Sequence, residues 1–429
     1  MFKLKPPLEN RNGILYVGNC NTLELAKIYD TPLYVYDENR IRENYKNLYN
    51  AFSSNYKKFK LYYAMKANNN PALIKILKSK GAGIDVSCPA EIYLAKKIGF
   101  QSSNMLYSGV YHRNEELKYA LDNNVPINLE DISQIERLFK LGKPKFISFR
   151  INPGIGSGKF KGLVFAGIDA KFGIIERDVM KAYEKAKNYG VKNFGIHMMS
   201  GSCVLDENYF VEITQKLMDI AGAVSQKLNI SFDFVDIGGG FGVPYQPDEK
   251  ELDVYAVGKK VCQKFKEKIE QYNLGEPVLL AEPGRYLMCD AGILLAKVHS
   301  IKNAYKKFIG VDAGMNTLIR PMMYGAYHEI LLANKLDAKP KEKVNIVGPI
   351  CENTDQIAKD RMMPEISQGD LLAVLNVGAY GFGMSSQYNN RPRAAEVLVN
   401  NGKHELIRKR ESFDDLINKV IIPKRLIKN

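Results

Sequence analysis

Strand-like and helix-like segments alternate between residues 60 and 284, and this alternation restricts the possible folds more than any other feature. Because strands that alternate with helices pair in parallel, eight such units in about 220 residues predict a closed (β/α)8 barrel of the TIM type. A doubly wound open sheet is the competing α/β topology. The helical segments include 71–80, 90–99 and 131–140. The apolar strand-like runs are 60–66, 83–87, 105–109, 127–130, 146–153, 194–202, 234–240 and 278–284.

The pattern changes after residue 295, where helical spacing fades and short β-rich runs follow. One of them, "AEVLVNNGKHELIRK" (395–409), holds Asn-Gly between two strand-like halves, which predicts a hairpin turn. Near the N-terminus, "NGILYVGN" (12–19) also resembles a strand and is expected to join the same β-rich region. We therefore predict a barrel domain at 36–285 and a discontinuous β-rich domain formed by 1–35 and 286–429.

The composition argues against a membrane, secreted or nucleic-acid-binding protein. The N-terminus lacks the apolar stretch of a signal peptide, and no apolar run reaches about 18 residues. The six cysteines form no CxxC pair, which indicates a reduced, cytoplasmic protein. The net charge is +14, but the lysines alternate with acids in helical segments such as 260–271, as on a solvated helix face. We expect a small-molecule partner and no nucleic acid.

The ends of the predicted strands carry side chains that could take part in a reaction. In such barrels the reactive side chains lie at the carboxyl ends of the strands. If these ends were only solvated caps, their residue types would be more random, and glycine would not repeatedly stand beside a charged residue. The groups at these ends are Lys66, Asp85–Ser87, Arg150–Asn152, His197–Ser202, Gly238–Gly240 and Glu282–Arg285.

Two glycine-containing turns predict a phosphate site. "DIGGGFGVPY" (236–245) ends the seventh strand, and its glycines let backbone N–H groups approach an anion. "EPGRYL" (282–287) ends the eighth strand. A tight turn also explains three glycines, but the loops after strands 7 and 8 are the usual phosphate site of this barrel.

Lys66 ends the strand "KLYYAMK" and predicts the cofactor. A lysine amine can form a Schiff base with an aldehyde, and beside a phosphate cradle that aldehyde is pyridoxal phosphate. A carboxylate opposite the pyridine nitrogen keeps the ring protonated, and Glu282 is the best candidate. Taken alone, a lysine at a strand end is more often a solvated cap.

A longer series of motifs resembles diaminopimelate decarboxylase, a pyridoxal-phosphate enzyme of the alanine-racemase-like barrel fold grouped with ornithine and arginine decarboxylases. The motifs occur in the expected order from about residue 30 to 415, and the set is specific although no single motif is. They are "YYAMKAN", "IDVSCPAE", "FRINPG", "KFGI", "DIGGGFG", "EPGR", "VDAGMNTLIRPMMYGAYHEI", "GPICENTD" and "GAYGFGMSSQYNNRPR".

The resemblance implies roles by position. Lys66 would carry the cofactor and Cys351 would donate a proton; both are therefore expected to be catalytic. The substrate-binding residues would be Arg285, Arg320, Tyr324, Glu352 and Tyr380. The cofactor-binding residues would be Lys66, Asp85, His197, Ser202, Gly238, Gly239, Gly240, Glu282, Gly284, Arg285 and Tyr380.

These roles suit a diamino dicarboxylate substrate. An arginine fork grips the far carboxylate with two parallel hydrogen bonds, and Glu352 complements the far ammonium. Cys351 can protonate Cα as a general acid after CO2 is lost. A lone cysteine is more often a small buried hydrophobe, which is the interpretation given to the other five. The resemblance also implies a homodimer, because Cys351 and its neighbours would come from the other subunit.

One position departs from the family pattern G-x-H-x-H-x-G-S. Here the sequence is "GIHMMSGS" (195–202), so His197 matches the first histidine and Met199 replaces the second, which normally stacks on the pyridine ring. His197 is expected to be a satisfied core residue. Because strand side chains alternate, His197 and Met199 are expected to share one face, and the Met199 thioether could pack on the ring.

The leading hypothesis is decarboxylation of meso-2,6-diaminopimelate to L-lysine and CO2, the last step of lysine biosynthesis. The nearest alternative is a paralogous decarboxylase of D-lysine, D-ornithine or a siderophore or antibiotic intermediate, which the Met199 departure motivates. A cofactor-free regulator would be expected to lack Lys66 or the glycine loop. A racemase would be expected to lack "CENTD" and "YNNRPR".

Overall fold

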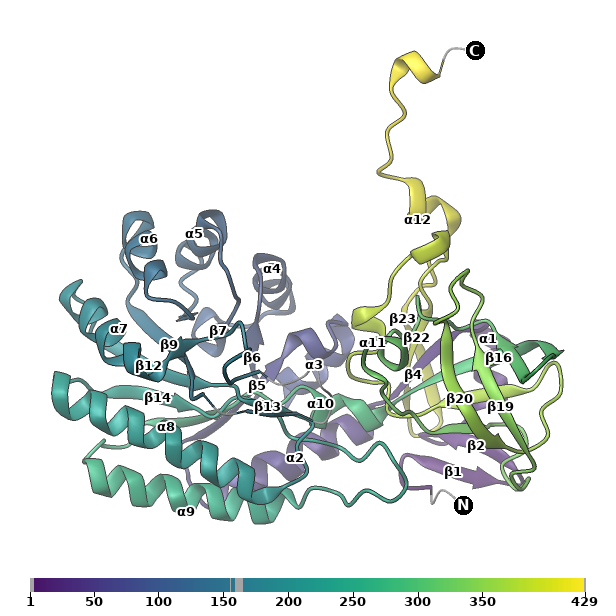
Figure 1. Cartoon of the computed structure of the whole chain (residues 1–429), viewed down its shortest axis with the longest axis horizontal. Coiled ribbons are helices and arrows are strands. Elements are labelled where there is room, and N and C mark those ends of the chain that lie inside the picture. The colour runs from purple at the N-terminus through teal and green to yellow at the C-terminus, as the bar shows by residue number, and fades with distance from the viewer. Residues whose placement is uncertain (1–3, 155, 159–164, 428–429) are drawn as a thin grey trace. The chain divides into compact units, whose positions relative to one another are not determined.

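The computed structural model describes residues 4–154, 156–158 and 165–427. Its contacts divide the chain into two compact units, shown in Figure 1. One unit is the continuous segment Arg40–Cys289, and the other combines Met1–Asn39 with Asp290–Asn429. Among the described residues, no helix combines the length and the apolar character needed to cross a bilayer.

The first unit is a closed barrel of eight parallel strands. Each strand pairs with the next in chain order, and β15 pairs with β5 to close the ring. This closure confirms the predicted (β/α)8 barrel and excludes the open sheet. The strands are β5 (Phe59–Ala64), β6 (Gly83–Val86), β7 (Met105–Tyr107), β8 (Ile127–Leu129), β9 (Phe146–Asn152), β12 (Asn193–Met198), β14 (Phe232–Asp236) and β15 (Val278–Ala281).

Amphipathic helices follow the strands and cover the barrel, as their apolar spacing predicts (Figure 1). They are α2 (Glu38–Ser53), α3 (Pro71–Ser79), α4 (Pro89–Ile98), α5 (Asn114–Asp122), α6 (Ser133–Leu141), α7 (Glu176–Asn188), α8 (Glu207–Leu228), α9 (Val254–Tyr272) and the short α10 (Arg285–Met288). Three two-residue strands lie in the loops: β10 (Ser157–Gly158), β11 (Ile174–Ile175) and β13 (Gly201–Ser202).

The second unit is built on a large sheet with the strand order β20-β19-β17-β16-β4-β22-β23, and β21 also pairs with β16 and β18. Its strands are β4 (Leu33–Asp37), β16 (Gly292–Asn303), β17 (Lys307–Val311), β18 (Ile330–Leu332), β19 (Glu342–Val347), β20 (Gln356–Met363), β21 (Leu371–Val374), β22 (Ala395–Asn400) and β23 (Lys403–Arg408). Its helices are α1 (Thr22–Tyr29), α11 (Arg320–Tyr324) and α12 (Phe413–Ile417). The predicted β-rich region is confirmed.

The Asn-Gly hairpin is also confirmed. Strands β22 and β23 pair antiparallel, and Asn401 and Gly402 between them have φ of 50° and 82°. Two successive positive φ values define the turn whose twist matches that of the flanking strands.

The N-terminal segment enters this unit in two ways. The run at 12–19 forms β2 (Ile14–Val17) in a separate small sheet with β1 (Leu8–Arg11) and β3 (Cys20–Asn21). Its Leu15 and Val17 still lie in the apolar core of the unit. The sequence analysis did not identify β4, which lies between β16 and β22 in the large sheet. All five residues of β4 are buried, so its sequence lacks the alternation of a half-exposed strand.

The central position of β4 predicts a stability effect. Leu33 is fully buried in the core of the β-rich unit, so Leu33→Ala should destabilise that unit by about 2–5 kcal/mol through lost burial and a residual cavity. Leu406 on β23 is exposed, and Leu406→Ala is the matched control, expected to change stability by less than about 0.5 kcal/mol. Urea unfolding measures both. Equal losses would contradict the placement of β4 in the core.

Candidate active site

Lys66 lies just beyond the end of β5. A single 3-10 turn, Met65–Ala67, follows the strand; its outer two residues are buried, whereas the Lys66 side chain is 47% exposed. Lys66 Nζ lies 2.5 Å from Oδ2 of Asp85, which is buried on the neighbouring strand β6. Lys66 is therefore paired with a buried carboxyl group, unlike a solvated strand cap.

The asparagines after Lys66 shape the turn. The Asn70 side chain accepts a 3.0 Å hydrogen bond from Ala72 N and caps α3, whose first residue is Pro71. Asn68 Oδ1 accepts a 3.0 Å hydrogen bond from Asn70 N. These local bonds stop the chain from continuing as a strand, so Lys66 is presented at the strand end.

Asp85 titrates far from its ordinary range. Burial, with the charge of Glu282 adding to it, raises the pKa of Asp85 to about 7, although Lys66 opposes the shift. A carboxyl group that changes charge near neutrality beside an amine is typical of a reactive site.

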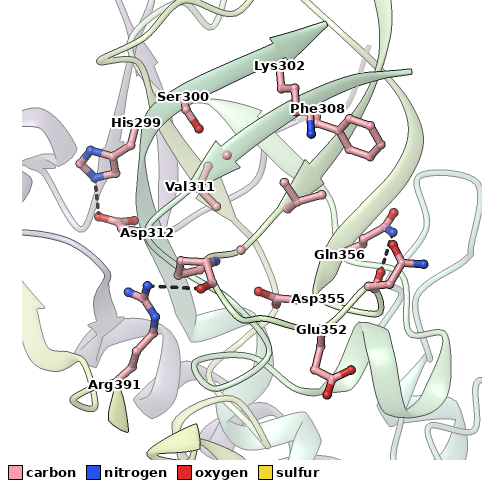
Figure 2. Close-up of a pocket in the computed structure, with 15 residues that line it drawn as sticks. His299, Ser300, Lys302, Phe308, Val311, Asp312, Glu352, Asp355, Gln356 and Arg391 are labelled. Carbon is pink, nitrogen blue, oxygen red and sulfur yellow. Dashed lines mark hydrogen bonds and ion pairs between the residues drawn. The ribbon is translucent and has the colours of Figure 1, made fainter. Parts of the chain in front are cut away.

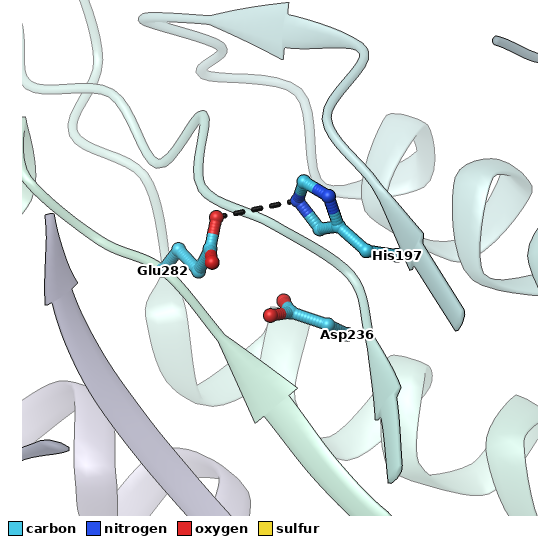
Figure 3. A group of neighbouring side chains, drawn as sticks. All are labelled: His197, Asp236 and Glu282. Carbon is cyan, nitrogen blue, oxygen red and sulfur yellow. Dashed lines mark ion pairs between the residues drawn. The ribbon is translucent and has the colours of Figure 1, made fainter. Parts of the chain in front are cut away.

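Glu282 and His197 form a buried pair at the ends of β15 and β12 (Figure 3). His197 Nε2 lies 3.2 Å from Glu282 Oε2, and His197 Nδ1 lies 2.7 Å from Asn128 Nδ2. Because an amide nitrogen only donates, Nδ1 accepts and Nε2 carries the proton toward Glu282. Burial lowers the pKa of His197, and the charge of Glu282 opposes this shift.

Glu282 is ionised although it is buried. Burial raises its pKa, but the interaction with His197 and the charges of Lys66 and Arg150 outweigh burial and lower the pKa of Glu282 to about 2. The barrel end therefore holds a fixed negative charge.

Asp236, at the end of β14, completes this group (Figure 3). Its Oδ1 accepts a 2.8 Å hydrogen bond from Gly238 N, which shapes the start of the glycine loop. Burial, followed by the charge of Glu282, raises the pKa of Asp236 well above the usual range of an aspartate. Burial and the charge of Glu282 thus disfavour the charged form of Asp236. Asp236 was not among the site residues predicted from the sequence.

The glycine loop requires glycine for steric reasons. Gly238 and Gly240 have φ of 69° and 95°, in the left-handed region. A Cβ on Gly238 would lie 2.5 Å from Met198 O, and one on Gly239 would lie 2.5 Å from Glu282 O. The loop is held against both neighbouring strand ends, and Glu282 N donates to Gly238 O at 2.7 Å.

A buried arginine lies next to this loop. Arg285 follows Gly284 at the start of α10, and its Nη1 donates to Tyr245 Oη at 2.6 Å. Its Nη2 donates to Ser202 Oγ at 3.3 Å. A Cβ on Gly240 would approach within 3.0 Å of the carbonyl of Gly201, the neighbour of Ser202. The arrangement offers cationic and hydroxyl donors to an anion. Tyr245 was also quoted in a motif without being assigned.

Met199 lies one residue beyond the end of β12, so strand alternation does not extend to it. Its side chain is half-buried, and its sulfur accepts a hydrogen bond of 3.2 Å from Gly239 N. The thioether therefore lies on the glycine loop, whereas His197 points to Glu282.

The other predicted site residues lie in the β-rich unit. Arg320, the first residue of α11, is 1% exposed, and its guanidinium lies 5.9 Å from the centre of the Tyr324 ring. Tyr380 is half-buried with φ of 58°, a costly conformation for a residue with a side chain. Such strain is common at functional sites.

Cys351 and Glu352 are exposed on the loop between β19 and β20. Cys351 N donates to Asn389 Oδ1 at 3.0 Å, and Tyr388 Oη donates to Glu352 Oε1 at 2.9 Å. The structure thus gathers the predicted residues into a barrel group and a β-rich group. The two groups belong to different compact units.

The titration of Asp85 predicts how stability depends on pH in the protein without bound ligand. Its pKa is raised from 3.8 to about 7, so its contribution to stability is complete below pH 3.8 and is lost as the pH rises to about 7. Asp85→Asn removes this titration, and its free energy of unfolding should fall less than the parent's over this range. Urea unfolding at several pH values measures the difference.

Asp360→Asn is the matched control. A hydrogen bond from Lys306 lowers the pKa of the exposed Asp360. The titration of Asp360 therefore changes the free energy of unfolding only below about pH 4. A variant at Asp85 that loses stability more steeply than the parent would contradict the raised pKa.

Comparison with known proteins agrees with this geometry. Residues 39–289 match the family model "Pyridoxal-dependent decarboxylase, pyridoxal binding domain". The chain is 47% identical to the diaminopimelate decarboxylase of Methanothermobacter thermautotrophicus over 99% of both chains. It is 39% identical to that of Archaeoglobus fulgidus, over 97% of this chain and 99% of the other.

A solved structure supports the same conclusion. The diaminopimelate decarboxylase of M. jannaschii in co-complex with L-lysine superposes with a TM-score of 0.88 at 34% identity, covering 98% of this chain and 99% of the other. The chain therefore belongs to the diaminopimelate decarboxylases, within the pyridoxal-dependent decarboxylase family.

Proposed function

We propose that this protein uses pyridoxal phosphate to decarboxylate meso-2,6-diaminopimelate to L-lysine and CO2, the last step of lysine biosynthesis. The observation that carries the proposal is the cluster of Lys66, ionised Glu282 and the glycine loop at one end of the barrel. Similarity over the full chain to enzymes of this name supports the choice of substrate.

The barrel end fits the cofactor. Lys66 supplies an amine for the aldehyde, and Ser202, Gly238–Gly240 and Arg285 offer donors and close backbone approach for the phosphate. Glu282 supplies a carboxylate for the pyridine nitrogen. When bound, pyridoxal phosphate supplies an electron sink for the pair left behind by CO2.

The protein groups hold protons where this chemistry needs them. Ionised Glu282 would accept a hydrogen bond from the protonated ring nitrogen of the bound cofactor, and His197 Nε2 lies 3.2 Å from its carboxylate. Asp85 positions the Lys66 amine through the 2.5 Å contact. Because Arg285 is buried against Tyr245 and Ser202, we assign it to the phosphate; its contact with the substrate stays a prediction.

The β-rich unit supplies the groups for the far end of the substrate. We assign Arg320 and Tyr324 to the far carboxylate, Glu352 to the far ammonium, and Tyr380 to both cofactor and substrate. Cys351 is assigned as the proton donor to Cα. These assignments divide the work between a cofactor-binding barrel (36–285) and a β-rich domain (1–35 and 286–429).

We also propose a homodimer with a shared active site. Cys351 and Glu352 are exposed on one chain, although a proton donor and an ammonium ligand act best away from water. Their loop is braced by Asn389 and Tyr388, as suits a loop that is presented to another subunit. All six cysteines are free thiols, which supports a cytoplasmic location.

The alternative is decarboxylation of another amino acid, such as D-lysine, D-ornithine or a siderophore or antibiotic intermediate. Met199 favours it, because a thioether lies on the glycine loop where the family pattern has a stacking histidine. Similarity over the full chain to diaminopimelate decarboxylases argues for a substrate with a second carboxylate, which an arginine such as Arg320 can bind with two parallel hydrogen bonds.

Replacement of Lys66 tests the cofactor assignment. Lys66→Ala should lower CO2 release from meso-diaminopimelate at least about 10³-fold, because the group that holds the cofactor is lost. It should also abolish the visible absorbance of the bound cofactor. Lys60→Ala is the matched control, since Lys60 is an exposed lysine on β5, the strand that leads to Lys66. Wild-type absorbance in Lys66→Ala would refute the role of Lys66.

A substrate panel separates the two candidate functions. CO2 release from meso-diaminopimelate, D-lysine and D-ornithine should be measured with the parent and with Arg320→Ala. The variant should raise KM for meso-diaminopimelate about 10- to 150-fold through loss of a charge-assisted hydrogen bond, and should have little effect on the monocarboxylates. A parent that prefers a monocarboxylate would establish the alternative.

A further inference from the structure

Two loops of the β-rich unit leave neighbouring parallel strands and touch each other. Strands β17 and β19 pair in parallel, so the loops that follow them begin at the same edge of the sheet. The first loop leads to Arg320, and the second carries Cys351 and Glu352. A Cβ on Gly348 would overlap Cα of Gly314, so the two backbones meet where only glycine fits.

Asp355 bridges these loops with its two carboxylate oxygens. Oδ1 accepts a 2.6 Å hydrogen bond from Met315 N, and Oδ2 accepts a 2.8 Å hydrogen bond from Ile350 N. The residue is 2% exposed. A Cβ on Gly314 would lie 2.8 Å from Oδ2, and one on Gly348 would lie closer still. The carboxylate thus occupies the space that the two glycines leave open.

The backbone of Asp355 closes the second loop on itself. Gly348 N donates to Asp355 O at 3.0 Å, and Asp355 N donates to Glu352 O at 3.0 Å. Both of these backbone bonds lie within the segment that carries Cys351. The side chain reaches the loop that leads to Arg320.

A third loop, residues 386–391, surrounds the same point. Arg391 Nη2 donates to Pro349 O at 3.2 Å, and Ser386 N donates to Asn316 O at 2.8 Å. Figure 2 shows Glu352, Asp355 and Arg391 around one pocket of about 650 Å³. Burial raises the pKa of Asp355, and the two backbone N–H groups and Arg391 oppose the shift. The Asp355 carboxylate thus forms a side-chain bridge between the first two loops.

We propose that Asp355 is a positioning residue that ties the proton donor Cys351 and the ammonium ligand Glu352 to the loop of Arg320. In the proposed homodimer Cys351 and Glu352 would enter the partner's active site. The bridge would therefore hold the loop that one chain presents to its partner at a fixed position relative to the chain's own Arg320. This inference rests on the roles proposed above for these three residues.

The chemistry of the bridge requires a carboxylate. Two backbone N–H groups need two acceptor oxygens, and an asparagine offers only one. In Asp355→Asn the amide NH2 would face a backbone N–H, so one loop would lose its bond without a change in side-chain volume.

The first test is amide hydrogen exchange of the protein without added cofactor. Asp355→Asn should speed exchange at Met315 or Ile350 by about tenfold or more, because a charge-assisted hydrogen bond is lost there. It should also change the rate and pH profile of Cys351 alkylation by iodoacetamide. Asp360→Asn is the matched control, as an exposed aspartate on β20 of the same unit. Unchanged exchange at both amides would overturn the bridge.

The second test uses the kinetics of the enzyme loaded with cofactor. Asp355→Asn should lower kcat and raise KM for meso-diaminopimelate together, while the visible absorbance of bound cofactor stays that of the parent. Faster exchange with unchanged kcat and KM would overturn the positioning role. A parent without decarboxylase activity would refute the proposed function, and the bridge would then be decided by exchange and alkylation alone.

Asp355→Glu keeps the inference testable if the amide variant does not fold. It retains both acceptor oxygens and lengthens the bridge by one methylene. Exchange at Met315 and Ile350 should stay within about threefold of the parent, because both bonds can form, while the displaced loops lower kcat. Unchanged kcat in this variant would overturn the proposal.

Discussion

The contact between Lys66 and Asp85 is the interaction around which the barrel end is organised. Asp85 and Glu282 both compete for the positive charge of Lys66 in a site with little water. Their pKa values separate, to about 7 and about 2, because Glu282 also has His197 and Arg150 as partners. One carboxyl can therefore change charge near neutrality beside the amine, while the other keeps a fixed negative charge.

Rigid support surrounds these titrating groups. Asp236 holds the start of the glycine loop, and that loop packs against the ends of β12 and β15 without room for a Cβ. The β-rich unit uses the same device, where Gly314 and Gly348 make room for the carboxylate of Asp355. In both units, glycine permits close backbone approach and a buried aspartate satisfies the N–H groups exposed there.

Sequence reasoning found the groups that carry chemistry better than those that hold them. Lys66 and Glu282 were found because each lies at the end of a predicted strand and has a charge that is unusual there, whereas the roles of Asp85 and Arg285 came from the resemblance to a known family. Asp236, Tyr245 and Asn128 were missed as participants, although Asp236 and Tyr245 stood within a quoted motif. Their roles depend on partners distant in sequence, such as Arg285 for Tyr245 and His197 for Asn128.

The sequence by itself determined the order of strands and helices, the hairpin at Asn401-Gly402 and the place of Lys66, because these depend on local periodicity and turn chemistry. Only the tertiary structure decided that β15 closes on β5, that β4 lies inside the large sheet, and which carboxyl groups are charged. Closure and pairing depend on contacts between distant segments. Protonation depends on burial and on neighbouring charges. The few residues that flank an aspartate or a glutamate in the sequence determine neither the burial of its carboxyl group nor the charges around it.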